Sequence, residues 1–412
     1  MSSSLMPLEE ALDKALAGLT CVCEMETLVL GEAQGRVLAE DVIATRHVPP
    51  ADNSAMDGFA VRRADLSQDL DNDQPVVGES LAGNPFNGPL APGAAVRIAT
   101  GALIPSGADT VIMQEYCTFT EESGSVILSA EGVRKSPLAA HIRRRGEDVA
   151  AGSILLTAGT ILRPQELGVL AAQGVARIPV RKKLRVAVFS TGDELHEPHE
   201  KDIGDSIYDS NRHMLMGLLS SLGCAVNDLG ILPDRLEIIT DALDKAAKDN
   251  DLLITSGGVS VGKADFVKPA VEALGEIDLW RMATKPGKPV MKGRIGDAMV
   301  LGLPGNPVAV MVSFLQFSRP LMLRMMGAVG RAVPSLKVPA AFEFKRKPGR
   351  REWLRARLTE DGARAEIFPL NSSGALTSLS WADGLVELPE ACTAVTEGET
   401  VTYIPLSGFS LL

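Results

Sequence analysis

The stretch RVAVFSTGDE at residues 185–194 decides the fold, because a run of apolar and β-branched residues ends in a glycine turn that carries two acidic residues. Three further apolar runs, at residues 224–229, 252–255 and 299–303, alternate with helical patterns. Such alternation is typical of βαβ units, in which helices connect neighbouring strands of a parallel sheet. We therefore predict an α/β domain with a parallel sheet over residues 183–330.

The chain has 412 residues, more than one hydrophobic core usually supports, so we expect further domains. Residues 51–140 hold Gly, Pro and Asn between short apolar pieces, which predicts an inserted β-rich domain. The flanks, residues 1–50 and 141–182, each combine a helical pattern with strand-like pieces, which predicts one discontinuous α+β domain. Residues 331–412 return to alternation, as at residues 353–358, which predicts a small β-barrel or sandwich.

The formal net charge is -11, from 41 Lys and Arg against 52 Asp and Glu. This charge works against general attraction to nucleic acid or to an anionic membrane surface, so an anionic substrate needs locally placed cations. The most apolar stretch, residues 308–317, is far shorter than the ~20 residues of a membrane span and is predicted to be a buried helix. Five scattered cysteines and a beginning without an export signal favour the cytoplasm.

Three glycine-bearing turns directly follow predicted strands, at residues 190–194, 255–260 and 303–307. Loops at the carboxyl ends of parallel strands converge on one crevice, and glycines there let backbone amides approach an anion. The alternative is that each turn only needs a residue with positive φ. The residues singled out in these turns are Ser190, Gly192, Ser256, Gly257, Gly258, Ser260, Pro304, Gly305, Asn306 and Pro307.

Charged residues lie in or near the same turns. Lys285 and Lys288 surround a rigid Pro-Gly turn, with Arg281 shortly before it, and would clamp a diphosphate or an oxyanion. The alternative is a solvated basic hairpin. Glu194 and Asp265 would repel a bare phosphate, whereas carboxylates can hold Mg²⁺ and Mg²⁺ can hold phosphate oxygens. Asp265 could instead be only the N-cap of a helix beginning at residue 266.

Seven motifs in order give the chain a close resemblance to one family. They are PPADNSAMDGFAV (49–61), RIATGALIP (97–105), RRRGEDV (143–149), STGDEL (190–195), TSGGVSVGKADF (255–266), KPGKP (285–289) and LPGNPV (303–308). The sequence resembles the molybdopterin molybdenumtransferases, which include the carboxyl-terminal part of gephyrin, over nearly its whole length. The resemblance implies a discontinuous elongated domain, an inserted β domain, an α/β molybdopterin-binding domain and a small β domain, assembled as a homodimer.

The resemblance also implies an activity, in which molybdate and adenylated molybdopterin give molybdenum cofactor and AMP with Mg²⁺ required. It implies cofactor-biosynthesis proteins and recipient enzymes as partners. In the family's dimer, the inserted domain of one subunit faces the pterin domain of the other, so Asp57 and Thr100 would approach the molybdate from the partner. Positions matching the family's site are Asp57, Thr100, Arg143, Glu194, Asp234, Asp265, Arg281, Lys285, Pro304 and Pro307.

Two positions depart from the family's pattern, and three other functions compete. Arg281 stands where relatives often have lysine, and Phe59 replaces the usual tyrosine.

The nearest rival function is that of the adenylyltransferase that acts one step earlier, which shares the TSGGVS-like loop but not the upstream motifs. A non-catalytic scaffold like the related region of gephyrin is disfavoured because the charged site positions are filled. A nicotinamide dehydrogenase is set aside because no G-x-G-x-x-G follows the first strand.

Overall fold

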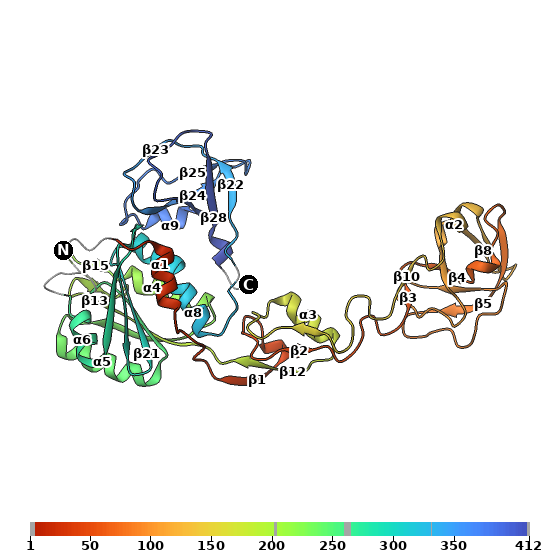
Figure 1. The fold of residues 1–412 in the computed structure, drawn as a ribbon, viewed down its shortest axis with the longest axis horizontal. Helices are drawn as coiled ribbons and strands as arrows, with labels where there is room; N and C mark the ends of the chain where they lie inside the picture. The colour runs from red at the N-terminus through yellow and green to blue at the C-terminus, as the bar shows by residue number, and fades with distance from the viewer. Residues whose placement is uncertain (1–4, 202–203, 259–264, 331, 410–412) are drawn as a thin grey trace. The chain divides into compact units, whose positions relative to one another are not determined.

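The structure is a computed structural model that describes residues 5–201, 204–258, 265–330 and 332–409 (Figure 1). The chain forms two compact units. The first comprises Met1–Glu40, Ala158–Gly168 and Ala176–Leu412, and the second comprises Asp41–Thr157 and Val169–Val175. Among the described residues, no helix has the length and apolar character that crossing a bilayer requires.

A six-stranded sheet forms the centre of the first unit. Its strands, in order across the sheet, are β16 (Ala225–Leu232), β13 (Arg185–Thr191), β17 (Leu252–Ser256), β21 (Ala298–Leu303), β20 (Pro289–Ile295) and β18 (Glu276–Arg281). The first four are parallel, as predicted, and they match the four apolar runs of the sequence. The sheet as a whole is mixed, because β20 runs antiparallel to both of its neighbours, β21 and β18. The cause is a two-residue Gly-Asp hairpin between β20 and β21, in which Gly296 has a φ of +57°.

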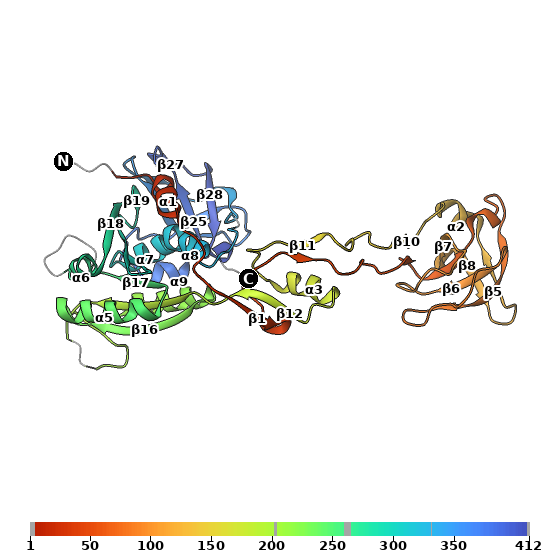
Figure 2. The same ribbon diagram turned by 60° about the horizontal axis from the view of Figure 1, so that its bottom comes forward.

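Helices cover both faces of this sheet (Figures 1 and 2). Successive residues of β13 point to opposite faces, so Val186 and Val188 join one core while Ala187 and Phe189 join the other. This double burial explains why the strands read as continuous apolar runs. The first core contains α1 (Leu8–Leu16), α4 (Ser210–Ser221), α7 (Pro307–Ser313) and α8 (Arg319–Met325), and the second contains α5 (Leu236–Asp249) and α6 (Val267–Leu274).

The apolar stretch at residues 308–317 is buried, as predicted. It lies in α7 and in the π-helical turn Phe314–Ser318 that follows. α6 is assigned from Val267, and Phe266 before it already has helical backbone angles, so the alternative that Asp265 caps this helix stays a prediction.

The carboxyl-terminal part of the first unit is a second sheet. Its strands, in order, are β19 (Thr284–Lys285), β24 (Arg351–Leu358), β26 (Gly384–Leu388), β28 (Thr400–Pro405) and β22 (Leu336–Pro339), and β25 (Ala365–Ile367) pairs with β24. A separate two-stranded ladder joins β23 (Phe344–Lys345) to β27 (Ala394–Val395). The helix of this region is α9 (Thr377–Trp381). An isolated bridge between Ala340 and Ala365 links the region after β22 to β25. The predicted alternation at 353–358 is wrong, because residues 352–356 are all buried. Trp353 faces the first core of the unit, while Leu354 faces a separate core within this sheet.

The second unit contains its own six-stranded sheet, consistent with the β-rich character expected there. Its strands, in order, are β7 (Thr110–Met113), β4 (Gly58–Val61), β6 (Ala95–Ile98), β5 (Asn72–Ser80), β9 (Ser125–Leu128) and β8 (Cys117–Thr120). α2 (Ala130–Lys135) follows, and two short ladders complete the unit: β3 (Asn53–Ser54) with β10 (Ile142–Arg143), and β2 (Val42–Ile43) with β11 (Ile154–Leu156).

Segments from either side of the insertion pair within the first unit. β1 (Met25–Val29) runs antiparallel to β12 (Arg177–Arg181), which brings residues about 150 positions apart into register. α3 (Pro164–Ala172) covers the helical pattern expected in the second flank. The multidomain α/β architecture is confirmed, whereas the exact four-domain boundaries stay a prediction.

Candidate active site

The three glycine-bearing loops follow β13, β17 and β21, whose carboxyl ends are adjacent in the sheet. Gly257 and Gly258 have φ angles of +89° and +66°, so the need for positive φ is real at both. Close approach is a second requirement, because a β-carbon on Gly258 would lie 2.8 Å from Thr191 Oγ1 in the neighbouring loop. The loops therefore pack against one another at one edge of the sheet, as the sequence predicted.

Four acidic residues from neighbouring loops interact at this edge. The backbone N–H groups of Asp193 and Asp234 each donate to the other residue's carboxylate, at 3.4 and 3.2 Å. Burial raises the pKa of Asp234 above its usual value, and the charges of Asp193, Glu194 and Asp265 raise that pKa further. A divalent cation would relieve this repulsion, so the carboxylate donors fit Mg²⁺.

The acidic cluster does not form a complete protein cage for a metal. Within the part of the chain that the structure describes, no three His, Cys, Asp or Glu side chains are grouped so that they could hold an ion. This arrangement suits Mg²⁺, which usually keeps several waters and binds through one or two carboxylates together with substrate phosphates.

A cavity of about 460 Å³ lies between the loops of the first sheet and the carboxyl-terminal sheet. Its lining comes from the 285–289 turn, the 304–309 segment and residues 350–373. The lining residues are Lys285, Pro286, Gly287, Lys288, Pro289, Pro304, Gly305, Asn306, Ala309, Arg350, Glu352, Arg355, Asn371 and Ser373. Four of them are cations and one is a carboxylate, so the cavity suits an anion although the whole chain is acidic.

Lys285 is held by a buried carboxylate from the second sheet. β19 pairs in parallel with β24, so Lys285 stands opposite Glu352 in the register. The Lys285 ammonium lies 2.8 Å from Glu352 Oε1, and the Glu352 side chain is 1% exposed. Asn371 donates to the same carboxylate at 3.1 Å, and Arg346 Nε lies 3.3 Å from Glu352 Oε2. Lys285 is therefore a positioned cation at the cavity wall and not part of a freely solvated hairpin.

Other residues predicted for this site lie at its border or outside the cavity. Arg281 ends β18 opposite Pro289 and is exposed, but it does not line the cavity. Ser190 is 1% exposed, and its hydroxyl has no hydrogen-bond partner among the described residues. Ser256 is also buried, and its hydroxyl meets Pro304 O at 3.4 Å. Ser260 lies outside the described residues.

The remaining predicted residues lie in the second unit. Thr100 donates to Asp57 Oδ1 twice, from its backbone N–H at 2.6 Å and from its hydroxyl at 2.9 Å. These hydrogen bonds, the backbone one foremost, lower the pKa of Asp57. Arg143 is exposed on β10. Phe59 is 3% exposed and packs against Phe119, so the position that departs from the family's tyrosine is part of the core of this unit.

Sequence reasoning missed the carboxyl-terminal contribution to the cavity. Arg350, Glu352, Arg355, Asn371 and Ser373 were all treated as part of a separate small domain. One signal was available: Glu352 and Arg355 are charged residues within the strand-like run of residues 351–358, which is buried along most of its length. Charged residues inside such a run are rare unless they have polar partners; here Glu352 pairs with Lys285, and Arg355 donates to the Ser378 hydroxyl at 3.0 Å.

Three family models match the chain. They are the MoeA N-terminal region (domain I and II) over residues 6–174, a probable molybdopterin binding domain over residues 187–324 and the MoeA C-terminal region (domain IV) over residues 337–406. The second match covers the sheet from residue 187 onward and all three glycine-bearing loops. It assigns that part of the chain to the class of molybdopterin-binding domains.

Full-length relatives narrow this class to one family. The molybdopterin molybdenumtransferase of Haemophilus influenzae is 40% identical over 98% of this chain and 99% of its own length, and that of Bacillus subtilis is 34% identical over 92% and 90%. A solved structure of the molybdopterin biosynthesis moeA protein from Pyrococcus horikoshii has a TM-score of 0.82 and 31% identity, covering 98% of this chain and 100% of that chain. The chain belongs to the molybdopterin molybdenumtransferase family, whose members are transferases.

Proposed function

We propose that this protein inserts molybdate into adenylated molybdopterin and releases AMP in a reaction that needs Mg²⁺. The observation that carries the proposal is the cavity that places Lys285, Lys288 and Arg350 beside the glycine-bearing loop at residues 303–307. The diphosphate of the substrate and the molybdate oxyanion both need cations nearby, and a chain with a net charge of -11 must supply them locally.

The side chains support separate roles in this reaction. Lys285 and Lys288, with backbone amides of the loops, hold the phosphates, and the cations offset charge that develops on the leaving phosphate. Ligand exchange at molybdenum depends on holding the reactants together and needs no protein nucleophile. Glu352 keeps the Lys285 ammonium at the cavity wall. Asp57 and Thr100 form a hydrogen-bonded pair that would meet the molybdate.

Glu194 and Asp265 would hold Mg²⁺, with Asp234 as their electrostatic neighbour. When bound, Mg²⁺ supplies polarisation of a phosphoryl oxygen and neutralises phosphate charge. The carboxylates alone would repel the substrate, so the proposal requires the metal and the nucleotide to bind together. Glu194→Gln should then raise the Mg²⁺ concentration needed for half-maximal AMP release.

The proposal also includes the oligomeric state of the active protein and the bounds of its four domains. The active form is a homodimer in which the inserted β-rich domain, residues 51–140, supplies Asp57 to the partner's pterin domain, residues 183–330. Residues 1–50 and 141–182 form the discontinuous elongated domain, and residues 331–412 form a small β-barrel. The reaction takes place in the cytoplasm, which agrees with five cysteines that are all free thiols.

The test supplies purified protein with adenylated molybdopterin, Mg²⁺ and molybdate, and measures AMP. The proposal predicts AMP release that requires both Mg²⁺ and molybdate. A parallel sample receives ATP and molybdopterin in place of the adenylated compound. Consumption of ATP there, with formation of adenylated molybdopterin, would show the adenylyltransferase activity instead and would contradict the proposal.

A further inference from the structure

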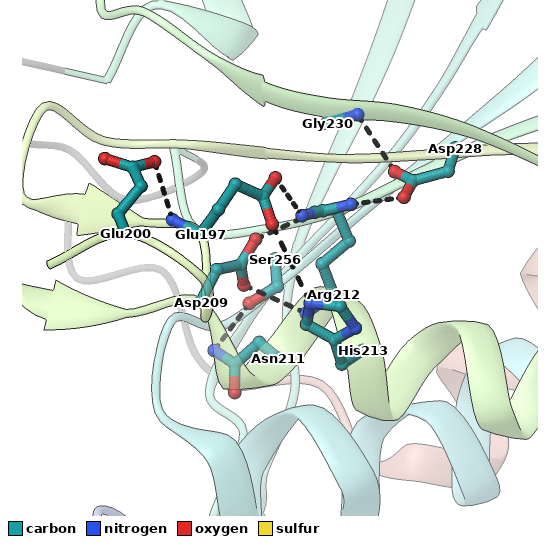
Figure 3. A network of polar contacts seen from close by, with 9 residues as sticks. All are labelled: Glu197, Glu200, Asp209, Asn211, Arg212, His213, Asp228, Gly230 and Ser256. Atoms are coloured by element: carbon teal, nitrogen blue, oxygen red, sulfur yellow. Dashed lines mark hydrogen bonds and ion pairs between the residues drawn. The ribbon is translucent and has the colours of Figure 1, made fainter.

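The first turn of α4 forms an ion pair with Glu197, in the segment after β13, and donates hydrogen bonds to Ser256 and Gly305; Figure 3 draws the contacts to Glu197 and Ser256. Asp209 is the N-cap of α4, and its carboxylate accepts from the Arg212 backbone N–H at 3.1 Å. The Arg212 side chain is 2% exposed and forms ion pairs with Asp209, at 2.9 Å, and with Glu197 and Asp228. Glu197 lies three residues after Glu194, so Arg212 ties the segment that follows β13 to the start of α4.

Asn211, which directly precedes Arg212, reaches the loops that follow β17 and β21. Its side-chain amide Nδ2 donates to Ser256 Oγ at 2.8 Å and to Gly305 O at 2.7 Å. Ser256 ends β17 and Gly305 follows β21. A primary amide has two N–H bonds, so Asn211 uses both of them to join the two loops. Figure 3 shows Asn211 directed toward Ser256 and away from the ion pairs of Arg212.

A backbone hydrogen bond joins the same two loops. The Gly257 N–H donates to Leu303 O at 3.0 Å, immediately beside the two acceptors of Asn211. Asn211 thus adds two side-chain hydrogen bonds to a junction that also holds this backbone bond, the pairing of Ser256 with Leu303, and the 3.4 Å hydrogen bond from the Ser256 hydroxyl to Pro304 O. Asn211 does not line the cavity, so it would act through the loops and not on the substrate itself.

We propose that Asn211 is a positioning residue, whose amide bridge between Ser256 and Gly305 fixes the spacing of the β17 and β21 loops for binding of the pterin nucleotide. Arg212 anchors the helix turn that carries Asn211. The identity of the substrate in this inference rests on the proposed function. The two hydrogen bonds of Asn211 are present in the protein without any ligand. Arg212 is unsuitable for the test, because its removal would leave three carboxylates facing one another.

The chain offers a matched control for the loss of one buried amide. Asn250 is 6% exposed, and its Nδ2 donates to Ala246 O at 2.9 Å. Asn250 lies just before the amino end of β17, whereas Ser256 is at the carboxyl end of the same strand. Asn250→Ala therefore removes an amide-to-carbonyl hydrogen bond without touching the loops.

The experiment compares hydrogen exchange of wild type, Asn211→Ala, Asn250→Ala and Ser256→Ala without any ligand. We expect the Gly257 amide to exchange about tenfold faster in Asn211→Ala, a smaller increase in Ser256→Ala, and no local change in Asn250→Ala. An unchanged Gly257 amide in Asn211→Ala would overturn the proposal. So would an increase spread equally over all core strands, because that pattern indicates general destabilisation. If Asn211→Ala does not fold, Ser256→Ala decides by the same criterion.

Kinetics then separate loop positioning from the reaction itself. For Asn211→Ala we expect KM for adenylated molybdopterin to rise about tenfold while kcat changes less than threefold, because the loops bind the substrate in both ground and transition states. A fall in kcat with unchanged KM would contradict the positioning role. If wild type releases no AMP, the proposed function fails, and the exchange data still decide whether Asn211 holds the loops.

Discussion

The Lys285 ammonium and the Glu352 carboxylate lie 2.8 Å apart, and they come from β19 and β24, two neighbouring strands of the carboxyl-terminal sheet. Glu352 is 1% exposed, whereas Lys285 is 40% exposed at the cavity wall. A buried carboxylate costs free energy unless a cation pairs with it. Separating Lys285 from Glu352 would therefore be unfavourable, and this cost holds the pair together. The cation most suited to bind phosphate is thus fixed by a residue of the carboxyl-terminal sheet.

Removing the charge of Glu352 should therefore lower both stability and activity. Glu352→Gln leaves Arg346, which is 2% exposed, without its carboxylate partner. We expect a loss of about 2 kcal/mol in the free energy of unfolding, below the roughly 3–5 kcal/mol of a fully buried pair because Lys285 is partly exposed. Urea unfolding measures this loss. The control is Glu366→Gln, which breaks a half-buried pair with Arg357 and should cost less than about 1 kcal/mol. Equal losses in the two variants would contradict a special role for Glu352.

Replacement of Lys285 tests the phosphate clamp. Lys285→Ala should weaken binding of the pterin nucleotide about tenfold, and Lys285→Arg should weaken it less, because attraction to phosphate needs the charge first. The alanine variant also removes one of the two cations that pair with Glu352 and leaves Arg346 as the other. Calorimetry gives the affinities, with Lys268→Ala on the exposed surface of α6 as the control. Wild-type affinity in the alanine variant would make the turn purely structural.

Asp234 gives a prediction for pH. Its pKa is raised by burial and by neighbouring carboxylates, so the charged form is less favourable in the folded than in the unfolded protein. The stability that Asp234 contributes is present below its ordinary pKa of 3.8 and is lost as pH rises through its folded pKa. Asp234→Asn should accordingly have a higher Tm than wild type at pH 7, and the difference should shrink near pH 3.8.

An exposed carboxylate supplies the opposite sign as a control. The pKa of Asp361 is lowered, first by the Thr359 hydroxyl and then by the Ala363 N–H. Asp361→Asn should therefore lower Tm at pH 7, with the effect fading as pH falls. A lower Tm for Asp234→Asn at pH 7 would show that Asp234 is not repelled by its neighbours.

Much of the first sheet could be predicted, because β13, β17 and β21 are buried on both faces and therefore read as apolar runs. β20 was missed since the Gly296-Asp297 hairpin was not recognised as a reversal of direction. The sequence could also predict that the glycine-bearing loops lie together, because the carboxyl ends of parallel strands lie on the same side of a sheet.

The cavity wall could not be predicted, because Glu352 reaches Lys285 only through pairing of β19 with β24, 67 positions further along the chain. The contacts of Asn211 could not be predicted from the sequence either. Its neighbours Ser256 and Gly305 are separated from it by 45 and 94 positions, and an asparagine near a helix start usually indicates only a cap.

Mixed dimers test whether Asp57 and Asp265 of one active site come from different subunits. Asp57→Ala and Asp265→Ala homodimers should both be nearly inactive. After unfolding together and refolding, about half of the dimers should be heterodimers with one intact composite site, giving about a quarter of wild-type activity. Tagging one parent measures the heterodimer fraction. Activity that stays at the level of the parents, with heterodimers present, would contradict the composite site.

The most direct measurement counts two products in one sample. Wild-type protein receives adenylated molybdopterin, Mg²⁺ and molybdate, and the AMP released and the molybdenum bound to the pterin are both determined. Insertion coupled to cleavage predicts equal amounts of the two, with neither formed when molybdate or Mg²⁺ is left out. AMP released at the same rate without molybdate, or no AMP from fully folded protein, would contradict the proposed function.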